Sequence, residues 1–319
     1  MCSSDLAYTF MNCTSLKTVI LHEGLLCINN STFKGCEALT TINVPASVTE
    51  IGNNAFENCT SLTTVNFAEG AAPTFGSAVF KNTGLVEIVL PASVTKLGSS
   101  MFIGCQNLKT VTVLGEVTEL PASIFADCVA LEKVNLPDSI YNIGNNAFEN
   151  AGIKEFPSPA GIEKLGKEAF LGSALTKITI PASITSWNSS PFKGCESLTT
   201  VIFEEGCTTV TGSAFSGCTA LTSVTLPDTI TYVGTSSFEG CTALTDLYVP
   251  LSVASLYANV FKGWTETQTI RFACSEADSA NFTNNWNTDC EAKILWNQTR
   301  TPSAEKPKDD DAKNETLKP

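Results

Sequence analysis

Large hydrophobic residues recur along most of this chain at a nearly constant interval. Phenylalanine marks the interval most clearly, at positions Phe10, Phe33, Phe56, Phe80, Phe102, Phe125, Phe148, Phe170, Phe192, Phe215, Phe238 and Phe261. Successive members of this series lie 22 to 24 residues apart. A period of this length predicts a solenoid, in which each repeat forms one coil and buries its apolar side chains against the neighbouring coils.

Each repeat contains a short alternating segment that predicts one strand. Between Phe33 and Phe56, Ile42 and Val44 alternate with polar residues at positions 41 and 43. This alternation is typical of a strand with one buried face. Pro45 should end the strand, because proline has no N–H to donate to a neighbouring strand.

The second half of each repeat returns the chain to the start of the next one. Val48 and Ile51 are expected to anchor this return limb in the core. We expect Gly52 to mark a turn, and Phe56 to open a further short turn that leads to the next strand. About twelve coils stacked at about 4.8 Å would form a rod or arc roughly 58 Å long.

A cysteine stands three residues after most of these phenylalanines. The cysteines of this slot are Cys13, Cys36, Cys59, Cys105, Cys128, Cys195, Cys218 and Cys241. Three internal repeats carry Thr83, Ala151 or Ser173 there instead, and each has one residue fewer before its next apolar anchor. The joint loss of the cysteine and of one loop residue indicates that the thiol fills a small buried gap in the turn.

The chain has 13 cysteines, and the slot cysteines allow two interpretations. Neighbouring coils would bring their Cα atoms within disulfide distance. A ladder of buried, reduced thiols is favoured, because alanine, serine and threonine replace cysteine at the equivalent positions. The closely spaced pairs of a zinc site are absent from the sequence. Whether Cys274 and Cys290 form a disulfide near the end of the chain is left open.

The repeats share the skeleton F-x-x-C-x-x-L-x-x-(V/I)-x-(V/L)-P-x-S-(V/I)-x-x-(I/L)-G-x-x-(A/S)-F. From about Phe10 to Phe261, this skeleton resembles that of the BspA-like leucine-rich repeat family of bacterial and protist surface proteins. The resemblance implies a leucine-rich-repeat solenoid, β-rich and right-handed, with a parallel sheet on its concave face. It also implies an extracellular or cell-surface protein with a role in adhesion or host interaction.

The two ends differ from the repeat array, which we place at residues 7–268. Residues 1–6 resemble a translated sequencing adapter and are expected to be a non-native start. Residues 269–298 form a C-terminal capping segment, in which Trp286 and Trp296 are expected to cover the last coil. Residues 299–319 have many charges and no apolar period, which predicts a disordered polar tail.

The composition argues against several classes of function. Lysine and arginine number 19 against 32 acidic residues, and the net charge of −13 disfavours nucleic acid or an anionic membrane as a partner. No stretch approaches the roughly 18 consecutive apolar residues of a membrane-spanning helix. The single histidine, His22, lies in an expected turn, and no regular carboxylate pair suits acid–base catalysis. We therefore expect a non-enzymatic protein with no catalytic residue, metal or cofactor.

The outward side of the predicted strands is the candidate binding surface. It comprises Thr41, Asn43, Thr64, Asn66, Glu87, Thr110, Thr112, Lys133, Asn135, Lys177, Thr179, Ser223, Thr225, Asp246 and Tyr248. Most are small and neutral, so Glu87, Lys133 and Tyr248 are among the few that would give specificity. We expect a monomer that binds a protein or glycan weakly and multivalently through this surface. The alternative is a passive spacer in the cell envelope, whose threonines and asparagines only hydrogen-bond one another.

Overall fold

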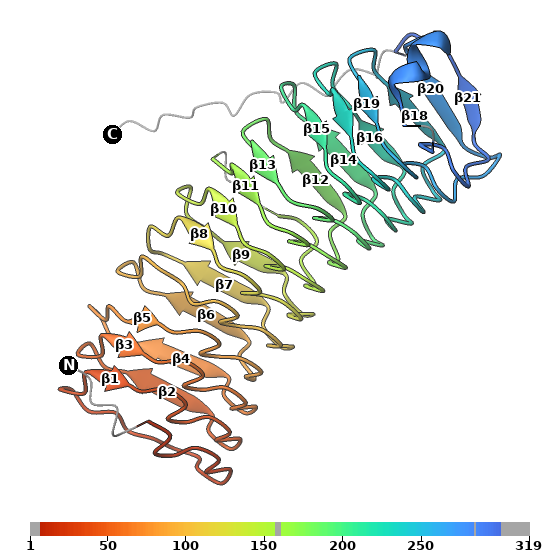
Figure 1. Ribbon diagram of the computed structural model, residues 1–319. Coiled ribbons are helices and arrows are strands. Elements are labelled where there is room, and N and C mark those ends of the chain that lie inside the picture. The colour runs from red at the N-terminus through yellow and green to blue at the C-terminus, as the bar shows by residue number, and fades with distance from the viewer. Residues whose placement is uncertain (1–6, 157–160, 284, 301–319) are drawn as a thin grey trace, which may run out of the picture.

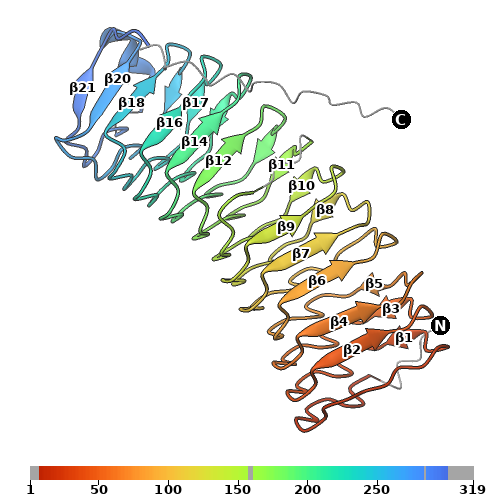
Figure 2. The same ribbon diagram turned by 180° about the vertical axis from the view of Figure 1, so that it is seen from behind.

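The long strands that form are parallel, and each pairs with a strand from a neighbouring coil. The computed structural model describes residues 7–156, 161–283 and 285–300. Figures 1 and 2 show an elongated solenoid with β1 near one end and β21 at the other. The fold class is therefore confirmed as a parallel β-solenoid of about eleven coils with almost no helix.

The longer strands form one side of the solenoid, which we call the long-strand face. They are β2 (Thr41–Val44), β4 (Thr64–Phe67), β6 (Glu87–Leu90), β7 (Thr110–Val113), β9 (Lys133–Asn135), β12 (Lys177–Ile180), β14 (Thr200–Phe203), β16 (Ser223–Thr225), β18 (Asp246–Val249), β20 (Thr269–Phe272) and β21 (Lys293–Leu295). In β2 the residues at 42 and 44 are buried and those at 41 and 43 are exposed, as the alternation predicts. The strand ends before Pro45.

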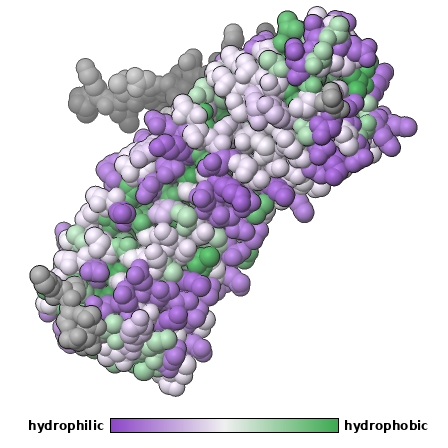
Figure 3. Space-filling view, in the orientation of Figure 1, coloured by the Kyte–Doolittle hydropathy of each residue, from purple (hydrophilic) through white to green (hydrophobic). Residues whose placement is uncertain are grey.

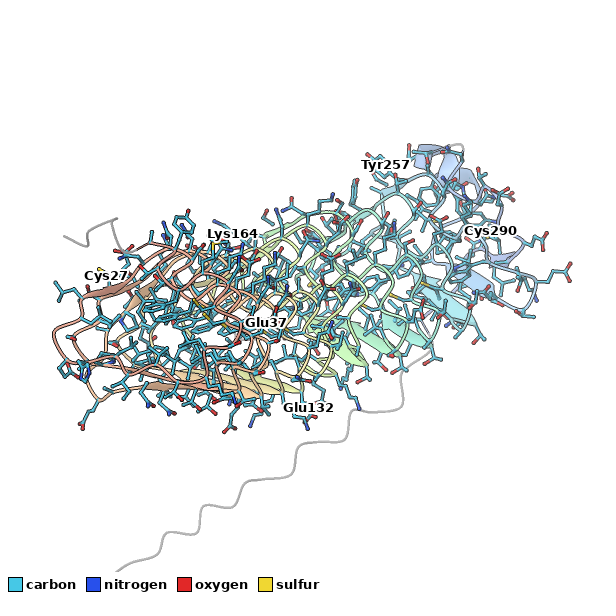
Figure 4. The ribbon with its side chains drawn as sticks, turned by 90° about the horizontal axis from the view of Figure 1, so that it is seen from below. Cys27, Glu37, Glu132, Lys164, Tyr257 and Cys290 are labelled. Carbon is cyan, nitrogen blue, oxygen red and sulfur yellow. The ribbon has the colours of Figure 1, made fainter. Side chains whose placement is uncertain are left out.

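A second ladder, which the sequence analysis missed, lies in the return limbs. These two-residue strands are β1 (Cys27–Ile28), β3 (Glu50–Ile51), β5 (Thr74–Phe75), β8 (Glu119–Leu120), β10 (Asn142–Ile143), β11 (Lys164–Leu165), β13 (Ser186–Trp187), β15 (Thr209–Val210), β17 (Tyr232–Val233) and β19 (Ser255–Leu256). Two residues are too few to show an alternation, which explains why sequence periodicity did not reveal them. In Figure 4, Cys27, Lys164 and Tyr257 lie along this side, and Glu132 lies on the opposite side.

The repeat phenylalanines form one continuous column through the solenoid. Neighbouring rings from Phe10 to Phe261 have centroids 4.9 to 6.3 Å apart, and the ring planes of most pairs are nearly parallel. All members from Phe33 onward are fully buried. Offset stacking of this kind adds to the free energy gained from burying the rings themselves.

The slot cysteines are free thiols, and from Cys36 onward they are buried. Each buried one donates its S–H to the carbonyl of the phenylalanine in the preceding coil, as Cys59 does to Phe33 O at 3.1 Å. Trp264 stands at the equivalent place after Phe261 and donates its Nε1–H to Phe238 O at 2.9 Å. The slot therefore supplies a hydrogen-bond donor as well as volume, which the sequence analysis did not foresee.

Site-resolved alkylation should separate the buried thiols from the exposed one. Burial raises the pKa of Cys59 and of Cys241 to about 12, so the reactive thiolate is scarce near neutral pH. Cys13 is exposed and should be alkylated at once in the native chain. Mass spectrometry of peptides after iodoacetamide treatment should show Cys59 and Cys241 modified only in denaturant. Rapid native labelling of Cys59 would contradict the buried ladder.

Two backbone positions in every Phe turn adopt the left-handed conformation. In one coil these are Asn54 and Asn58, with φ of 58° and 60°, two residues before and two after Phe56. Asparagine, aspartate, glycine and serine predominate at the equivalent positions, and most of these types tolerate positive φ. The turn also hydrogen-bonds to the next coil, since Phe33 N–H donates to Ala55 O at 2.9 Å.

Gly52 has a different role from the predicted one. Gly52 has no positive φ, and its N–H donates to Ile28 O at 2.7 Å, directly after β3. A Cβ there would lie 2.6 Å from the backbone nitrogen of Asn30 in the preceding coil. Glycine is required because two backbones approach closely, not because the chain reverses.

The first coil also departs from the prediction. The repeat places a strand before His22, but none forms there, and residues 17–22 belong to no sheet. Phe10 is 41% exposed and Cys13 is exposed, whereas the repeat predicts burial of both. Within the described residues this coil has a neighbour on one side only, so its apolar residues are half covered.

The capping segment extends the ladder instead of lying across it as a separate unit. β20 pairs with β18, and β21 pairs with β20. Between β20 and β21 lies a short 3-10 helix, η2 (Ala277–Asn281). Trp286 packs edge-on against Phe261, at a centroid distance of 6.1 Å, and Trp296 stacks on Phe272 at 4.6 Å. Cys274 and Cys290 are both free thiols, so no disulfide joins them.

Candidate binding surface

The long-strand face presents the predicted binding residues on its outer side. Thr41, Asn43, Thr64, Asn66, Glu87, Lys133, Lys177, Ser223, Thr225 and Asp246 are exposed, and Thr110, Thr112, Asn135, Thr179 and Tyr248 are half-buried. Parallel pairing sets equivalent residues side by side, as at Thr41 beside Thr64. Figure 3 shows mainly hydrophilic and weakly polar residues on the visible side of the molecule, with apolar residues in small groups.

Some of these polar side chains already have partners within the face. Asn66 donates its Nδ2–H to Asn43 Oδ1 at 2.8 Å, and Asn135 donates to Thr112 Oγ1 at 2.9 Å. Such pairs stabilise neighbouring strands and leave fewer free donors for a ligand. The side chains of these two pairs are therefore at least partly engaged within the chain.

The long-strand face is interrupted three times in the described part of the chain, between β4 and β6, between β9 and β12, and between β16 and β18. Grooves open at the first two interruptions. The first lies between β4 and β6, which are not paired, and has a volume of about 460 Å³. The second lies beside β9 and has a volume of about 680 Å³. Between the two grooves, β6, β7 and β9 form a three-stranded sheet, which we call the central panel.

The first groove coincides with a change in chain length. The interval from Phe56 to Phe80 is the longest of the series, at 24 residues, and the loop after Phe80 is one residue shorter than usual. The backbones of the two coils approach closely at Gly84, where a Cβ would lie 2.4 Å from Thr60 O. The strands that follow do not pair.

A side chain that turns inward explains the second groove. The coil after Phe148 forms no long strand within the described residues 151–156. Phe156 instead packs edge-on against Phe148 and Phe170, with centroids at 5.3 and 5.1 Å. It also lines the groove together with Lys133 and Glu155.

The central panel combines opposite charges with exposed apolar side chains. Glu87 lines the first groove and Lys133 the second, and both pair in register with Thr110 between them. Val89 and Leu114, which also line the first groove, are 53% and 55% exposed. An acidic group, a basic group and exposed apolar side chains thus lie on or beside one three-stranded sheet.

At the other end of the face, Tyr248 is partly covered by cations of the same chain. The guanidinium carbons of Arg271 and Arg300 lie 5.8 and 4.9 Å from its ring centroid. Arg271 Nε donates to Asp246 Oδ1 at 2.7 Å, and this hydrogen bond raises the pKa of the Arg271 guanidinium. Tyr248 and Asp246 are therefore less available than the sequence suggested.

The described residues hold few groups suited to metal binding or acid–base chemistry. His22 is exposed, and no set of three or more metal-ligating side chains occurs among the described residues. Glu57 is the one buried carboxylate in that part of the chain. Burial raises its pKa, but hydrogen bonds from Lys34 and Lys81 more than offset this and hold the pKa below its usual value. This carboxylate acts as an internal ion-pair partner.

The repeat pattern identifies the family of the chain. A sequence profile described as a BspA type leucine rich repeat region matches residues 6–109, 73–199 and 185–290, which together span most of the chain. The chain belongs to the BspA-type leucine-rich repeat family. This BspA-type chain matches no protein of curated function in sequence.

Solved structures support the same fold for this BspA-type chain. A leucine-rich repeat protein from Bacteroides ovatus is 23% identical with a TM-score of 0.60, covering 88% of this chain and 91% of that one. The pneumococcal vaccine antigen PcpA is 20% identical with a TM-score of 0.54, covering 80% and 79%. Among the described residues, no helix is long and apolar enough to cross a membrane.

Proposed function

We propose that this chain is a non-enzymatic surface or secreted protein that binds a protein partner through the central panel of its long-strand face. The two interruptions that flank β6–β7–β9, each with a groove, carry this proposal. They provide two grooves that can receive projecting side chains of a partner. A long, continuous ladder of small polar residues would offer little relief to recognise.

The charges of the panel favour a protein over a glycan. Glu87 and Lys133 present opposite charges two coils apart, about 10 Å by strand spacing. Paired charges of this kind set the orientation of a protein partner and suppress wrong ones. The exposed Val89 and Leu114 add the apolar centre that protein interfaces use.

The family and its solved members support a location outside the cell. PcpA is described as a vaccine antigen, which fits an exposed protein. The repeat solenoid is rigid, so binding costs little conformational entropy. These points together support a role in adhesion.

A binding screen with charge-reversed variants tests the proposal. The full chain is immobilised for surface plasmon resonance and exposed to extracellular-matrix proteins at up to tens of micromolar, and in parallel to a glycan array. Lys133→Glu and Glu87→Lys should each weaken a protein hit by about tenfold, because each places a like charge against the partner.

Lys164→Glu is the matched control for Lys133→Glu. It makes the same charge change on an exposed residue of β11, in the second ladder of two-residue strands. It should leave the affinity unchanged. Equal loss in this control, a response to glycans alone, or no protein hit at all would contradict the proposal.

A further inference from the structure

The chain turns back over the long-strand face after its last strand. Asn297 and Gln298 donate their N–H groups to Cys274 O and Phe272 O, at 3.0 and 2.9 Å. Arg300 then reaches the coil of β16, more than seventy residues earlier in sequence. Residues 299 and 300 of the expected polar tail are therefore described, and residues 301–319 lie outside the described part of the chain.

The Arg300 side chain contacts three different groups. Its Nη2 donates to the carbonyl oxygen of Leu226 and to Asp228 Oδ1, each at 2.7 Å. Its guanidinium carbon lies 4.9 Å from the centroid of the Tyr248 ring. A carbonyl, a carboxylate and an aromatic face thus converge on one guanidinium.

This combination is selective for arginine. A guanidinium is planar, donates from several N–H groups at fixed angles, and stacks on aromatic rings. An ammonium group lacks the plane, and a neutral urea lacks the charge that attracts Asp228 and the ring. The neighbouring carboxylate of Asp246 is already held by Arg271, so Asp228 is the acidic group of the site.

The contact is also open to exchange. The side chains of Arg300 and Asp228 are 36% and 75% exposed, and ion pairs at such exposure contribute little net free energy. The site lies on the same long-strand face as the central panel, and the chain carries a net charge of −13. A partner with exposed arginines would approach such a chain readily.

We propose that Tyr248, Asp228 and the Leu226 carbonyl form a guanidinium-binding site that Arg300 occupies in cis. An arginine side chain of a protein partner takes the place of Arg300 when the partner binds. The partner's part in this inference rests on the proposed function, whereas the site itself does not. Arg300 then acts as an internal competitor that lowers the apparent affinity of the site for arginine.

The test uses N-acetyl-arginine amide as the probe, with N-acetyl-citrulline amide as its neutral counterpart. The full chain carries ring-labelled tyrosine, and nuclear magnetic resonance follows the Tyr248 signals, assigned with Tyr248→Phe among the 5 tyrosines. Arg300→Ala empties the site. It should bind the arginine probe at least about threefold more tightly than the original chain, because the competitor is gone.

Asp228→Asn in the Arg300→Ala background should return the probe affinity to that of the original chain or below. Citrulline amide should cause no Tyr248 shift in any variant. Equal affinity of Arg300→Ala and the original chain, or equal shifts with arginine and citrulline, would overturn the site.

A measurement on the unchanged chain covers the case in which Arg300→Ala disturbs the local fold. With labelled arginine, the Nε–H signal of Arg300 must move toward its solvent-exposed position as the probe is added, and its failure to move overturns the inference. If the probe binds while the matrix screen finds no protein, the site stands and the proposed function fails. If the screen succeeds and the probe does not bind, only this inference fails.

Discussion

Replacing Phe125 with alanine should lower the free energy of unfolding by about 3–5 kcal/mol. The ring is fully buried and lies between Phe102 and Phe148, at centroid distances of 5.7 and 5.2 Å. Its removal leaves a cavity in the middle of the column. Backbone hydrogen bonds hold the turn on one side, since Phe125 N–H donates to Ala147 O, and they limit collapse around the cavity.

The solenoid geometry adds a second expectation for Phe125→Ala. Each coil contacts only its neighbours, so a weak central coil uncouples the two halves. Urea unfolding followed by circular dichroism should therefore show a lower midpoint and a broader transition. The matched control is Phe10→Ala, which removes a ring that is 41% exposed and stacks on Phe33 alone. Its cost should be under about 1.5 kcal/mol, and an equal cost for both variants would contradict the column.

Sequence periodicity was sufficient to predict the coil, the long strand and the buried column. These features depend on side chains that repeat in register, such as Phe33 and Ile42, and a repeat makes each copy a test of the others. Local departures were also visible in sequence. Trp264 stands in the cysteine slot, and asparagine or glycine stands two residues after nearly every repeat phenylalanine. These signals would have predicted the slot donor and the left-handed turns.

The grooves and the Arg300 site could not be predicted in the same way. Each depends on a non-repeating event: an added residue before Phe80, the inward rotation of Phe156, and the return of the chain from Asn297 to Arg300. A contact across more than seventy residues leaves no periodic trace. The candidate binding residues do lie on the outward side of the long strands, but several of them are paired within the chain.

Gly98→Ala should destabilise the chain as strongly as the loss of a core side chain. A Cβ on Gly98 would lie 1.8 Å from the carbonyl oxygen of Gly76 and 2.7 Å from its carbonyl carbon. Both are backbone atoms, so no side-chain rotation can relieve the contact, and the two coils must separate. Overpacking a well-packed site typically costs 1–3 kcal/mol and sometimes more. We expect about 3 kcal/mol or more here, because separating the coils also lengthens the hydrogen bonds between them.

Gly212→Ala is the matched control, because the same methyl group would there meet nothing closer than 3.5 Å, at Thr235 O. Gly212 has no positive φ, so alanine fits its backbone and reduces the entropy of the unfolded chain. Its stability should be unchanged or rise by up to about 1 kcal/mol. Urea unfolding of both variants measures these changes in the free energy of unfolding. Asn188 occupies the position of its repeat that is equivalent to Gly98, four residues before the repeat phenylalanine. The repeat pattern therefore does not require glycine there in every coil. Glycine is needed only where two backbones lie as close together as they do at Gly98. A fully stable Gly98→Ala would mean that the coils are farther apart than this contact requires.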